Sequence, residues 1–289
     1  MTCPLCGAEA EAAFTTSDRN RALSRERFAY SRCTACGTYF LAQVPPDLGR
    51  YYPQEYYEVA DPGRVARIEA PRLALIARYV SGGRLIEIGP GPGHFARAAR
   101  EAGFEVTGIE MDAQCCARLE RDGVTAIHTE APEQALAALA PARAIAMWHV
   151  VEHLEHPWAV LEAAAARLEP GGVLAVAMPN PQSLQFRLLR GRWAHVDAPR
   201  HLFLIPYPAL RSRLEELGLE VREVTSSDAV SRALNGMGWE FALRRFPARH
   251  PGTRPTRGAA GALTLALAPF ERRGLGGAAY TVIAVRPDR

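Results

Sequence analysis

The sequence predicts an α/β protein in which helices cover both faces of a mostly parallel β-sheet. Short apolar runs alternate with helical patterns over residues 81–225, and this alternation favours parallel strands joined by helical crossovers. The 289 residues, 48% of them hydrophobic, are enough for one sizeable core and a small additional module. Seven segments have the length and apolar character of strands: 84–88, 105–109, 124–127, 144–148, 173–178, 219–225 and 280–285.

The chain divides into three regions. Residues 1–44 contain cysteine pairs and short polar loops, 45–80 form a connector with a first helix at about 66–80, and 81–289 form the α/β domain. The last predicted strand follows a long interval, 226–278. Because a structureless loop of that length is unusual in a compact domain, we expect the interval to form a helical cap.

Composition and charge narrow the classes of function. The net charge is +3, so no strong field favours nucleic acid or a membrane surface. All 34 basic residues are arginine, and a chain without lysine cannot form the Schiff bases of lysine-dependent carbonyl or pyridoxal chemistry. We find no signal peptide and no apolar run of about 18 residues, which predicts a cytoplasmic protein without a transmembrane segment. The oligomeric state is not predicted.

Two similar cysteine pairs mark the N-terminal module. Cys3 and Cys6 are followed by a glycine, and so are Cys33 and Cys36. In a reducing compartment such pairs are typical metal ligands. Each CxxC turn lets two thiolates bind one ion, and two turns complete a closed tetrahedral site. The pattern predicts a zinc-ribbon-like module with structural Zn²⁺; the alternatives are two unrelated surface turns or a redox pair.

A glycine-rich turn follows the first predicted strand of the α/β domain. Residues 85–95 read LIEIGPGPGHF, and Gly89, Gly91 and Gly93 allow the backbone to approach a ligand closely. The turn differs from the dinucleotide pattern GxGxxG, and no phosphate-binding GKS or GKT follows. Glu110 ends the next strand, where an acid can hold both hydroxyls of a ribose. These features predict a Rossmann-like fold with seven strands and a nucleotide-type cofactor.

Residues 66–225 resemble the class I S-adenosylmethionine-dependent methyltransferases. The likeness rests on the EIGPGPG turn, on AMWHVVEHLEHP at 146–157 and on EPGGVLAVAMPN at 169–180. It implies S-adenosylmethionine as cofactor, with the glycines of the turn around its methionine part. Further residues are implied to contact its amino group, ribose and adenine: Glu87, Glu110, Met111, Thr129 and Glu130.

The whole chain is also similar to a bacterial subgroup of these enzymes with an N-terminal CxxC…CxxC module. Shared features are the tyrosine-rich connector at 51–57 and the GRWAHVDAPRHL segment at 191–202. Such proteins occur in natural-product and cell-surface sugar pathways, so the resemblance implies a small-molecule acceptor. Two alternatives stay open: an RNA methyltransferase that docks RNA through its zinc module, and a non-catalytic protein that binds the cofactor.

A first histidine-rich segment follows the predicted strand 144–148. Ligands of open α/β sheets lie beyond the carboxyl ends of the strands, so this segment is placed to meet cofactor and acceptor. We expect Trp148 and His149 beside the cofactor, and His149 and His153 are candidate catalytic residues. For His153 the alternative is a buried residue that holds the loop.

A second histidine-rich segment follows the predicted strand 173–178. His195 and His201 are candidate general bases, because imidazole titrates near neutral pH, and Asp197 is a candidate to orient one of them. Trp193 and Arg200 are candidates to hold an aromatic or anionic acceptor. Both histidines have an alternative role as loop caps, and an acceptor that is already acidic needs no base.

Overall fold

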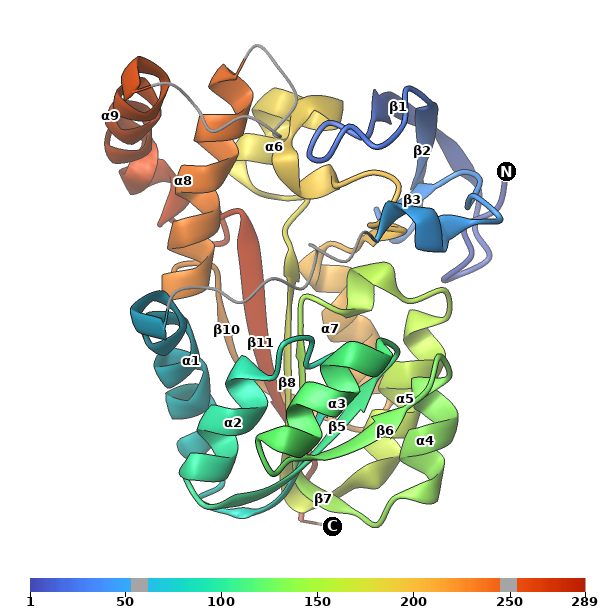
Figure 1. Ribbon diagram of the computed structural model, residues 1–289. Helices are drawn as coiled ribbons and strands as arrows, with labels where there is room; N and C mark the ends of the chain where they lie inside the picture. The colour runs from blue at the N-terminus through green and yellow to red at the C-terminus, as the bar shows by residue number, and fades with distance from the viewer. Residues whose placement is uncertain (53–61, 245–253, 289) are drawn as a thin grey trace.

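A seven-stranded sheet lies at the centre of the computed structural model, which describes residues 1–52, 62–244 and 254–288 (Figure 1). The strands are β4 (Gly83–Ile88), β5 (Phe104–Glu110), β6 (Thr125–His128), β7 (Ala142–Trp148), β8 (Leu168–Pro179), β10 (Glu220–Thr225) and β11 (Ala279–Val285). Their order is β10-β11-β8-β7-β4-β5-β6. Strand β11 runs antiparallel to both of its neighbours, β10 and β8, and the other neighbouring strands of this sheet run parallel to one another. The predicted α/β fold with a mostly parallel sheet is confirmed.

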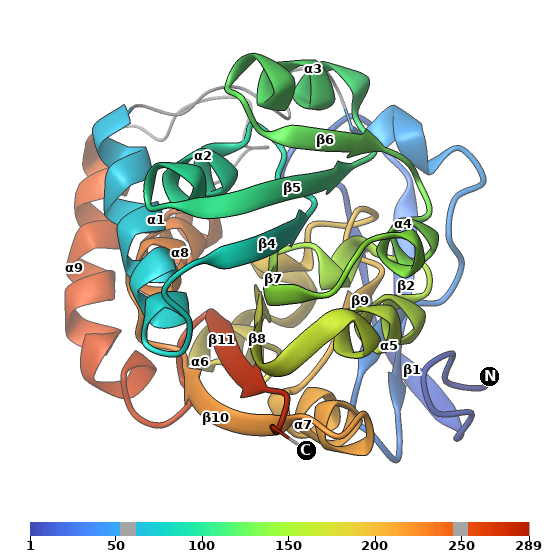
Figure 2. The same cartoon turned by 90° about the horizontal axis from the view of Figure 1, so that it is seen from below.

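Helices cover both faces of this sheet, as predicted (Figure 2). One face is covered by α1 (Pro62–Ala77), α2 (His94–Glu101) and α3 (Ala113–Arg121). The other face is covered by α4 (Pro132–Ala138), α5 (Pro157–Arg167) and α7 (Tyr207–Glu216). A short helix, α6 (Leu184–Leu189), follows β8.

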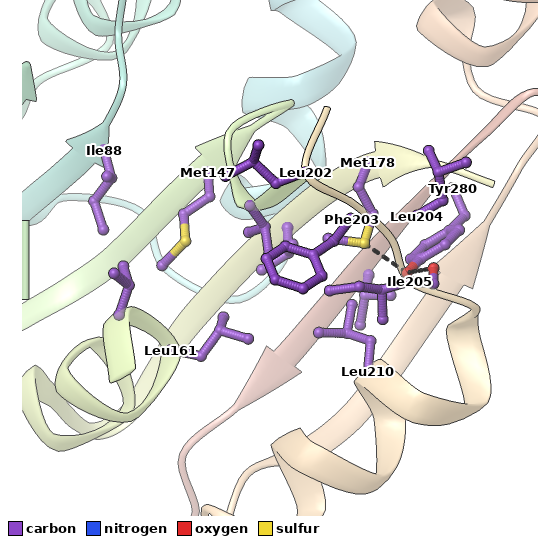
Figure 3. Packing of buried hydrophobic residues seen from close by; sticks show 14 of the residues in the cluster. Ile88, Met147, Leu161, Met178, Leu202, Phe203, Leu204, Ile205, Leu210 and Tyr280 are labelled. Carbon is purple, nitrogen blue, oxygen red and sulfur yellow. Dashed lines mark hydrogen bonds between the residues drawn. The ribbon is translucent and has the colours of Figure 1, made fainter. Parts of the chain in front are cut away.

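Neighbouring residues of a strand contribute to opposite layers of the core. Leu85 packs with the layer of α1, α2 and α3, whereas Ile86 packs with the layer of α4, α5 and α7. Figure 3 shows the second layer, in which Met147, Met178 and Tyr280 lie on adjacent strands. Because both faces are buried, the inner strands β4, β7, β8 and β11 are apolar along most of their length, which is why the sequence reveals them.

A second sheet contains the N-terminal module. It has four antiparallel strands in the order β1 (Ala10–Ser17), β2 (Arg27–Cys33), β3 (Tyr39–Leu41) and β9 (Phe203–Leu204). Residues 1–44 are expected to hold cysteine pairs and short polar loops, but three strands, β1, β2 and β3, lie there in the structure. The fourth strand, β9, comes from the segment between β8 and β10. This sheet therefore joins the N-terminal module to a segment of the α/β domain that lies far from it in the sequence.

The interval between β10 and β11 contains two helices, α8 (Ala229–Leu243) and α9 (Arg254–Glu271). Figure 1 and Figure 2 place them together, with α8 next to α1, on the side of the sheet that α1 covers. Residues 245–253 of this interval, and Tyr56 and Tyr57 of the tyrosine-rich connector, lie outside the described residues. Within the described ranges, none of the helices combines the length and apolar character needed to cross a membrane.

Candidate active site

The glycine-rich turn connects β4 to α2 at the carboxyl end of the sheet. Gly89, Gly91 and Gly93 have φ angles of 65°, 51° and 80°, in the left-handed region that disfavours side chains. Space is also limited, because a Cβ added to Gly89 would lie 2.6 Å from Cγ2 of Val150. The turn therefore packs directly against the segment that follows β7.

Glu110 ends β5 and ties down the same turn. Its buried carboxylate accepts a hydrogen bond from the Gly91 N–H at 2.9 Å through Oε2. Its Oε1 accepts from the N–H groups of Met111 and Asp112, at 2.8 and 2.9 Å. A carboxylate has about four acceptor positions, so a hydroxyl can still bind here. The structure thus brings together the acid and the turn that the sequence places 19 residues apart.

The residues expected around adenine lie at the ends of β5 and β6. Met111 is 54% exposed, so its side chain is accessible to a flat ring that binds at this edge. The Thr129 N–H donates to the carbonyl of Glu110 at 2.9 Å and thereby holds the two strand ends together. Glu130 is exposed next to it. The three residues therefore share one edge of the site.

Glu87 lies on β4 behind the turn. It is 3% exposed, and no described residue donates a hydrogen bond to its Oε2. Burial, helped by the nearby Glu69, raises the pKa of Glu87 well above its usual value, while Arg72 acts in the opposite direction. Because a buried carboxylate with an unsatisfied oxygen attracts a cation, Glu87 fits the amino group of a methionine moiety.

Trp148 and His149 stand at the end of β7. The Trp148 ring is buried, with the Arg72 guanidinium 4.8 Å above it and the Phe95 ring centroid 5.2 Å away. His149 has a φ of 59°, an uncommon conformation for a non-glycine residue and a frequent one at functional sites. Burial, with the charge of Arg72, lowers the pKa of His149 to about 3, so its imidazole is neutral at pH 7.

Glu152, His153 and His201 form a cluster whose ligand atoms all lie within 4.8 Å of one another. The two imidazole rings are nearly perpendicular, with centroids 4.6 Å apart. Burial lowers the pKa of His153 to about 4 and also lowers that of His201. Sequence analysis selected both histidines but missed Glu152; its place in a histidine-rich segment directly after a strand was the available signal.

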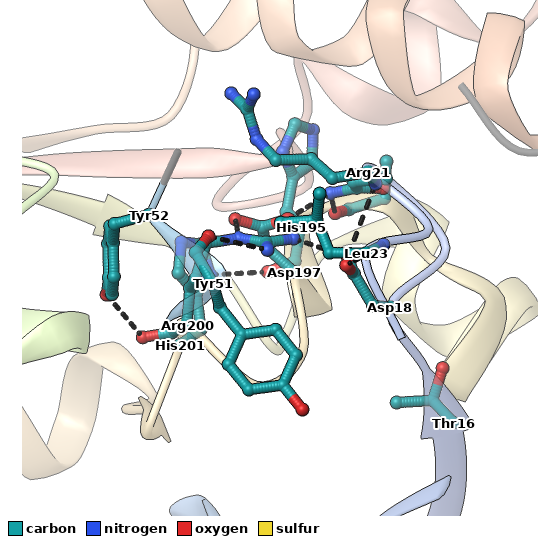
Figure 4. A network of polar contacts seen from close by, with 12 residues as sticks. Thr16, Asp18, Arg21, Leu23, Tyr51, Tyr52, His195, Asp197, Arg200 and His201 are labelled. Carbon is teal, nitrogen blue, oxygen red and sulfur yellow. Dashed lines mark hydrogen bonds and ion pairs between the residues drawn. The ribbon is translucent and has the colours of Figure 1, made fainter. Parts of the chain in front are cut away.

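The other two candidates of the second segment, Asp197 and His195, contact neighbouring groups of the protein (Figure 4). Asp197 accepts hydrogen bonds from Arg200 at 2.8 and 2.9 Å, so it orients the guanidinium and not a histidine. These bonds outweigh the effect of burial and hold the pKa of Asp197 well below its usual value. His195 is buried, with Nε2 3.1 Å from the carbonyl of Leu234.

The predicted contact of Trp193 and Arg200 with an acceptor is wrong for this structure. Arg200 is fully buried and forms ion pairs with Asp18, at 2.7 Å, and Asp197, at 2.8 Å. Trp193 is 1% exposed and donates its indole N–H to Oε1 of Gln185 at 3.1 Å. Arg200 therefore connects the N-terminal sheet and the α/β domain, and Trp193 packs within the segment that follows β8, so neither side chain faces a ligand.

The four cysteines of the N-terminal module converge on one point. All four sulfur atoms lie within 4.8 Å of one another, with Cys3–Cys36 at 3.9 Å and Cys6–Cys33 at 3.4 Å. Sulfurs bound to a tetrahedral zinc at about 2.3 Å are about 3.8 Å apart, so the cluster fits this ion. Burial raises the pKa of the Cys33 thiol, but hydrogen bonds from the Cys36 N–H and Cys6 outweigh it and lower the pKa to about 6.

A glycine turn and an acid at the carboxyl ends of adjacent parallel strands are the arrangement of α/β proteins that bind nucleoside-containing cofactors. A family of methyltransferase domains matches residues 63–224, more than half of the chain. The chain belongs to this family, the S-adenosylmethionine-dependent methyltransferases.

Two curated relatives illustrate the similarity. A malonyl-[acyl-carrier protein] O-methyltransferase from Enterobacter lignolyticus is 30% identical over 183 residues, covering 60% of this chain and 68% of the relative. A ubiquinone biosynthesis O-methyltransferase from Bordetella pertussis is 30% identical over 132 residues, covering 43% of this chain and 55% of the relative. The chain thus spans about two thirds of the first relative and about half of the second.

Solved structures agree on the fold. A methyltransferase from Archaeoglobus fulgidus aligns with a TM-score of 0.52 at 19% identity, covering 80% of this chain and 97% of that one. The [4+2]-cyclase SpnF aligns with a TM-score of 0.50 at 21% identity, covering 75% and 81%. At these identities the similarity concerns the fold alone.

Proposed function

We propose that this protein transfers the methyl group of S-adenosylmethionine to an oxygen atom of a small-molecule acceptor in a biosynthetic pathway. One observation carries the proposal: the glycine turn packs on Val150, so it adjoins the segment that bears Glu152 and His153. A cofactor-binding turn and a cluster of buried ionisable groups therefore share one end of the sheet. Both curated relatives are named as O-methyltransferases, which supports transfer to oxygen, and the one named for ubiquinone biosynthesis supports a small-molecule acceptor.

In this proposal, residues in and around the glycine turn bind different parts of the cofactor. S-adenosylmethionine supplies an electrophilic methyl group on a positively charged sulfur. The buried Glu87 is placed to neutralise its amino group, and Glu110 to accept the ribose hydroxyls. The exposed Met111 side chain is placed to cover the adenine. Glu152, His153 and His201 are the groups available to receive the proton of an acceptor hydroxyl or to orient that hydroxyl.

We also propose that the four-cysteine cluster holds a structural zinc ion. Two CxxC turns supply four sulfurs, and Gly7 and Gly37, each with a φ of 73°, allow the chain to turn directly after each pair. Four thiolates leave no open position, so such an ion has no place for a reacting water. Its contribution is to the stability of the N-terminal sheet.

Methyl transfer itself tests the proposed function. Protein with zinc bound is incubated with methyl-labelled S-adenosylmethionine and a panel of hydroxylated aromatics, carboxylic acids, nucleotide-activated sugars and transfer RNA. We expect label in a small-molecule fraction and none in RNA. Label in RNA alone would favour the RNA alternative, and cofactor binding without transfer to any acceptor would favour a non-catalytic role.

Glu110→Ala is expected to weaken binding of S-adenosylhomocysteine by about 1–3 kcal/mol, roughly 5- to 150-fold, because a charged hydrogen-bond acceptor is lost. Isothermal calorimetry measures this directly. Glu110→Gln keeps the side chain's size and separates the loss of charge from disturbance of the turn. The control is Glu120→Ala, an exposed glutamate on α3. Equal affinity of Glu110→Ala and wild type would contradict the ribose assignment.

A further inference from the structure

We propose that Glu152, His153 and His201 form a second metal site, for a divalent cation, at the carboxyl end of β7. Glu152 and His153 lie on a 3-10 turn (Val151–His153), and His201 precedes β9. Their ligand atoms already lie within 4.8 Å of one another. An ion about 2.0–2.2 Å from each donor needs donors about 3–4 Å apart, so small side-chain rotations suffice.

The hydrogen bonds of the two histidines fix the tautomers that a metal requires. Nδ1 of His153 is 3.0 Å from the carbonyl oxygen of Arg200, and Nδ1 of His201 is 2.9 Å from that of His195. Because a carbonyl only accepts, each Nδ1 carries the proton and each Nε2 has an available lone pair. Metal-bound histidines almost always donate their other ring N–H in this way.

Tyr52 and the backbone support the same arrangement. The Tyr52 hydroxyl lies 3.0 Å from Nδ1 of His153. It also donates a hydrogen bond to the Arg200 carbonyl at 3.4 Å (Figure 4). The Leu202 N–H donates to the carbonyl of Glu152 at 2.8 Å and so joins the two segments that carry the ligands. The cluster is therefore held by contacts from outside it.

The surroundings of Glu152 support a cation site independently of the distances between the three side chains. Its side chain is 1% exposed, and neither carboxylate oxygen accepts a hydrogen bond from any residue in the described ranges. Nδ1 of His149 lies 3.4 Å from Oε1. A buried carboxylate without partners is costly, and a bound cation removes this cost.

The chemistry of the donors defines the ion. Two neutral imidazoles and one carboxylate suit divalent manganese, iron, cobalt or zinc and leave coordination positions open for a ligand. This donor set is harder than the four thiolates of the N-terminal cluster, so an ion that binds thiolates poorly, such as manganese, is expected at this site and not at the cysteines. With an ion in this site the three side chains are its ligands and do not themselves take a proton. If the proposed function holds, the ion binds the acceptor oxygen, and the acceptor hydroxyl releases its proton to solvent more readily. Acceptors with two adjacent oxygen atoms are then favoured.

Titration with Mn²⁺ tests the site. The protein is first brought to one zinc per chain, which the four thiolates retain. Because Mn²⁺ stands lowest in affinity among the first-row ions, it leaves this zinc in place, and the second site is free of zinc when Mn²⁺ is added. We expect the electron paramagnetic resonance signal of free Mn²⁺ to show one bound ion per chain, with nitrogen couplings from imidazole. Glu152→Gln and His201→Gln should each weaken binding by at least about 10-fold. The matched controls Glu155→Gln and His156→Gln, both exposed, should bind as wild type.

Two results would overturn the proposal. One is a well-folded wild-type protein that binds no Mn²⁺, and the other is bound Mn²⁺ without nitrogen coupling whose affinity ignores both ligand substitutions. Thermal melting identifies any variant that fails to fold, and the wild-type measurement does not depend on the variants. Because neither cofactor nor acceptor is present, a failed titration leaves the methyl-transfer experiment intact, and the reverse is also true.

Discussion

Cys33→Ser is expected to lower the free energy of unfolding by about 3 kcal/mol or more and to release zinc. In small zinc domains the binding free energy of about 10–16 kcal/mol is also folding free energy, so a lost thiolate is lost stability. Cys33 ends β2, in the middle of the N-terminal sheet, and is fully buried. Urea unfolding of the full chain, together with the zinc content of the purified protein, measures both effects.

The control for this substitution is Cys115→Ser. Cys115 is also buried but lies on α3, far from the cysteine cluster in the fold, and it should keep the zinc. If Cys33→Ser abolished methyl transfer while zinc content and stability stayed at wild-type values, the proposed structural role would be wrong. A zinc-free wild-type protein of full stability would contradict it as well.

The central sheet is predictable from the sequence because its strands are buried on both faces. Segments such as β7 and β8 are then continuous apolar runs, and turns and helices separate them visibly along the chain. The glycine turn and Glu110 are predictable for the same reason. Each follows directly on such a strand, so the sequence position already fixes the end of the sheet at which it lies.

The N-terminal sheet is not predictable in this way. Its last strand, β9, has two residues, Phe203 and Leu204, and a pattern of period two cannot be recognised in so short a segment. Its partner β3 has three residues and lies about 160 positions earlier in the chain. Pairing of this kind depends on the tertiary packing of both segments and leaves no local signal.

The candidate site shows the same limit at the level of side chains. The sequence predicts His153 and His201 as candidates because each lies in a segment that follows a predicted strand and because imidazole titrates near neutral pH, but it does not give the distance between them. Only the fold shows that His201 lies close to Glu152 and that Asp197 forms an ion pair with Arg200. A cluster made by residues almost 50 positions apart is a property of the loop path, which local patterns do not encode.

Arg200→Leu is expected to lower the free energy of unfolding by about 3–5 kcal/mol. The guanidinium is completely buried and pairs with Asp18 and Asp197, and it also donates to the carbonyl of Tyr51 at 3.2 Å. Removing one partner of a buried ion pair leaves the other charge buried and uncompensated. Here two carboxylates would be left, between the N-terminal sheet and the α/β domain. Urea unfolding measures the change.

Neutralising the two carboxylates separates the effect of uncompensated charge from the effect of lost packing. If uncompensated charge is the cause, Arg200→Leu should cost much less in a chain that also carries Asp18→Asn and Asp197→Asn, because the triple variant buries no net charge. Arg211→Leu, which removes an exposed pair with Glu215, should cost at most about 1 kcal/mol. An equal loss for Arg200→Leu in both backgrounds would show that packing, and not the ion pairs, makes Arg200 necessary for joining the two sheets.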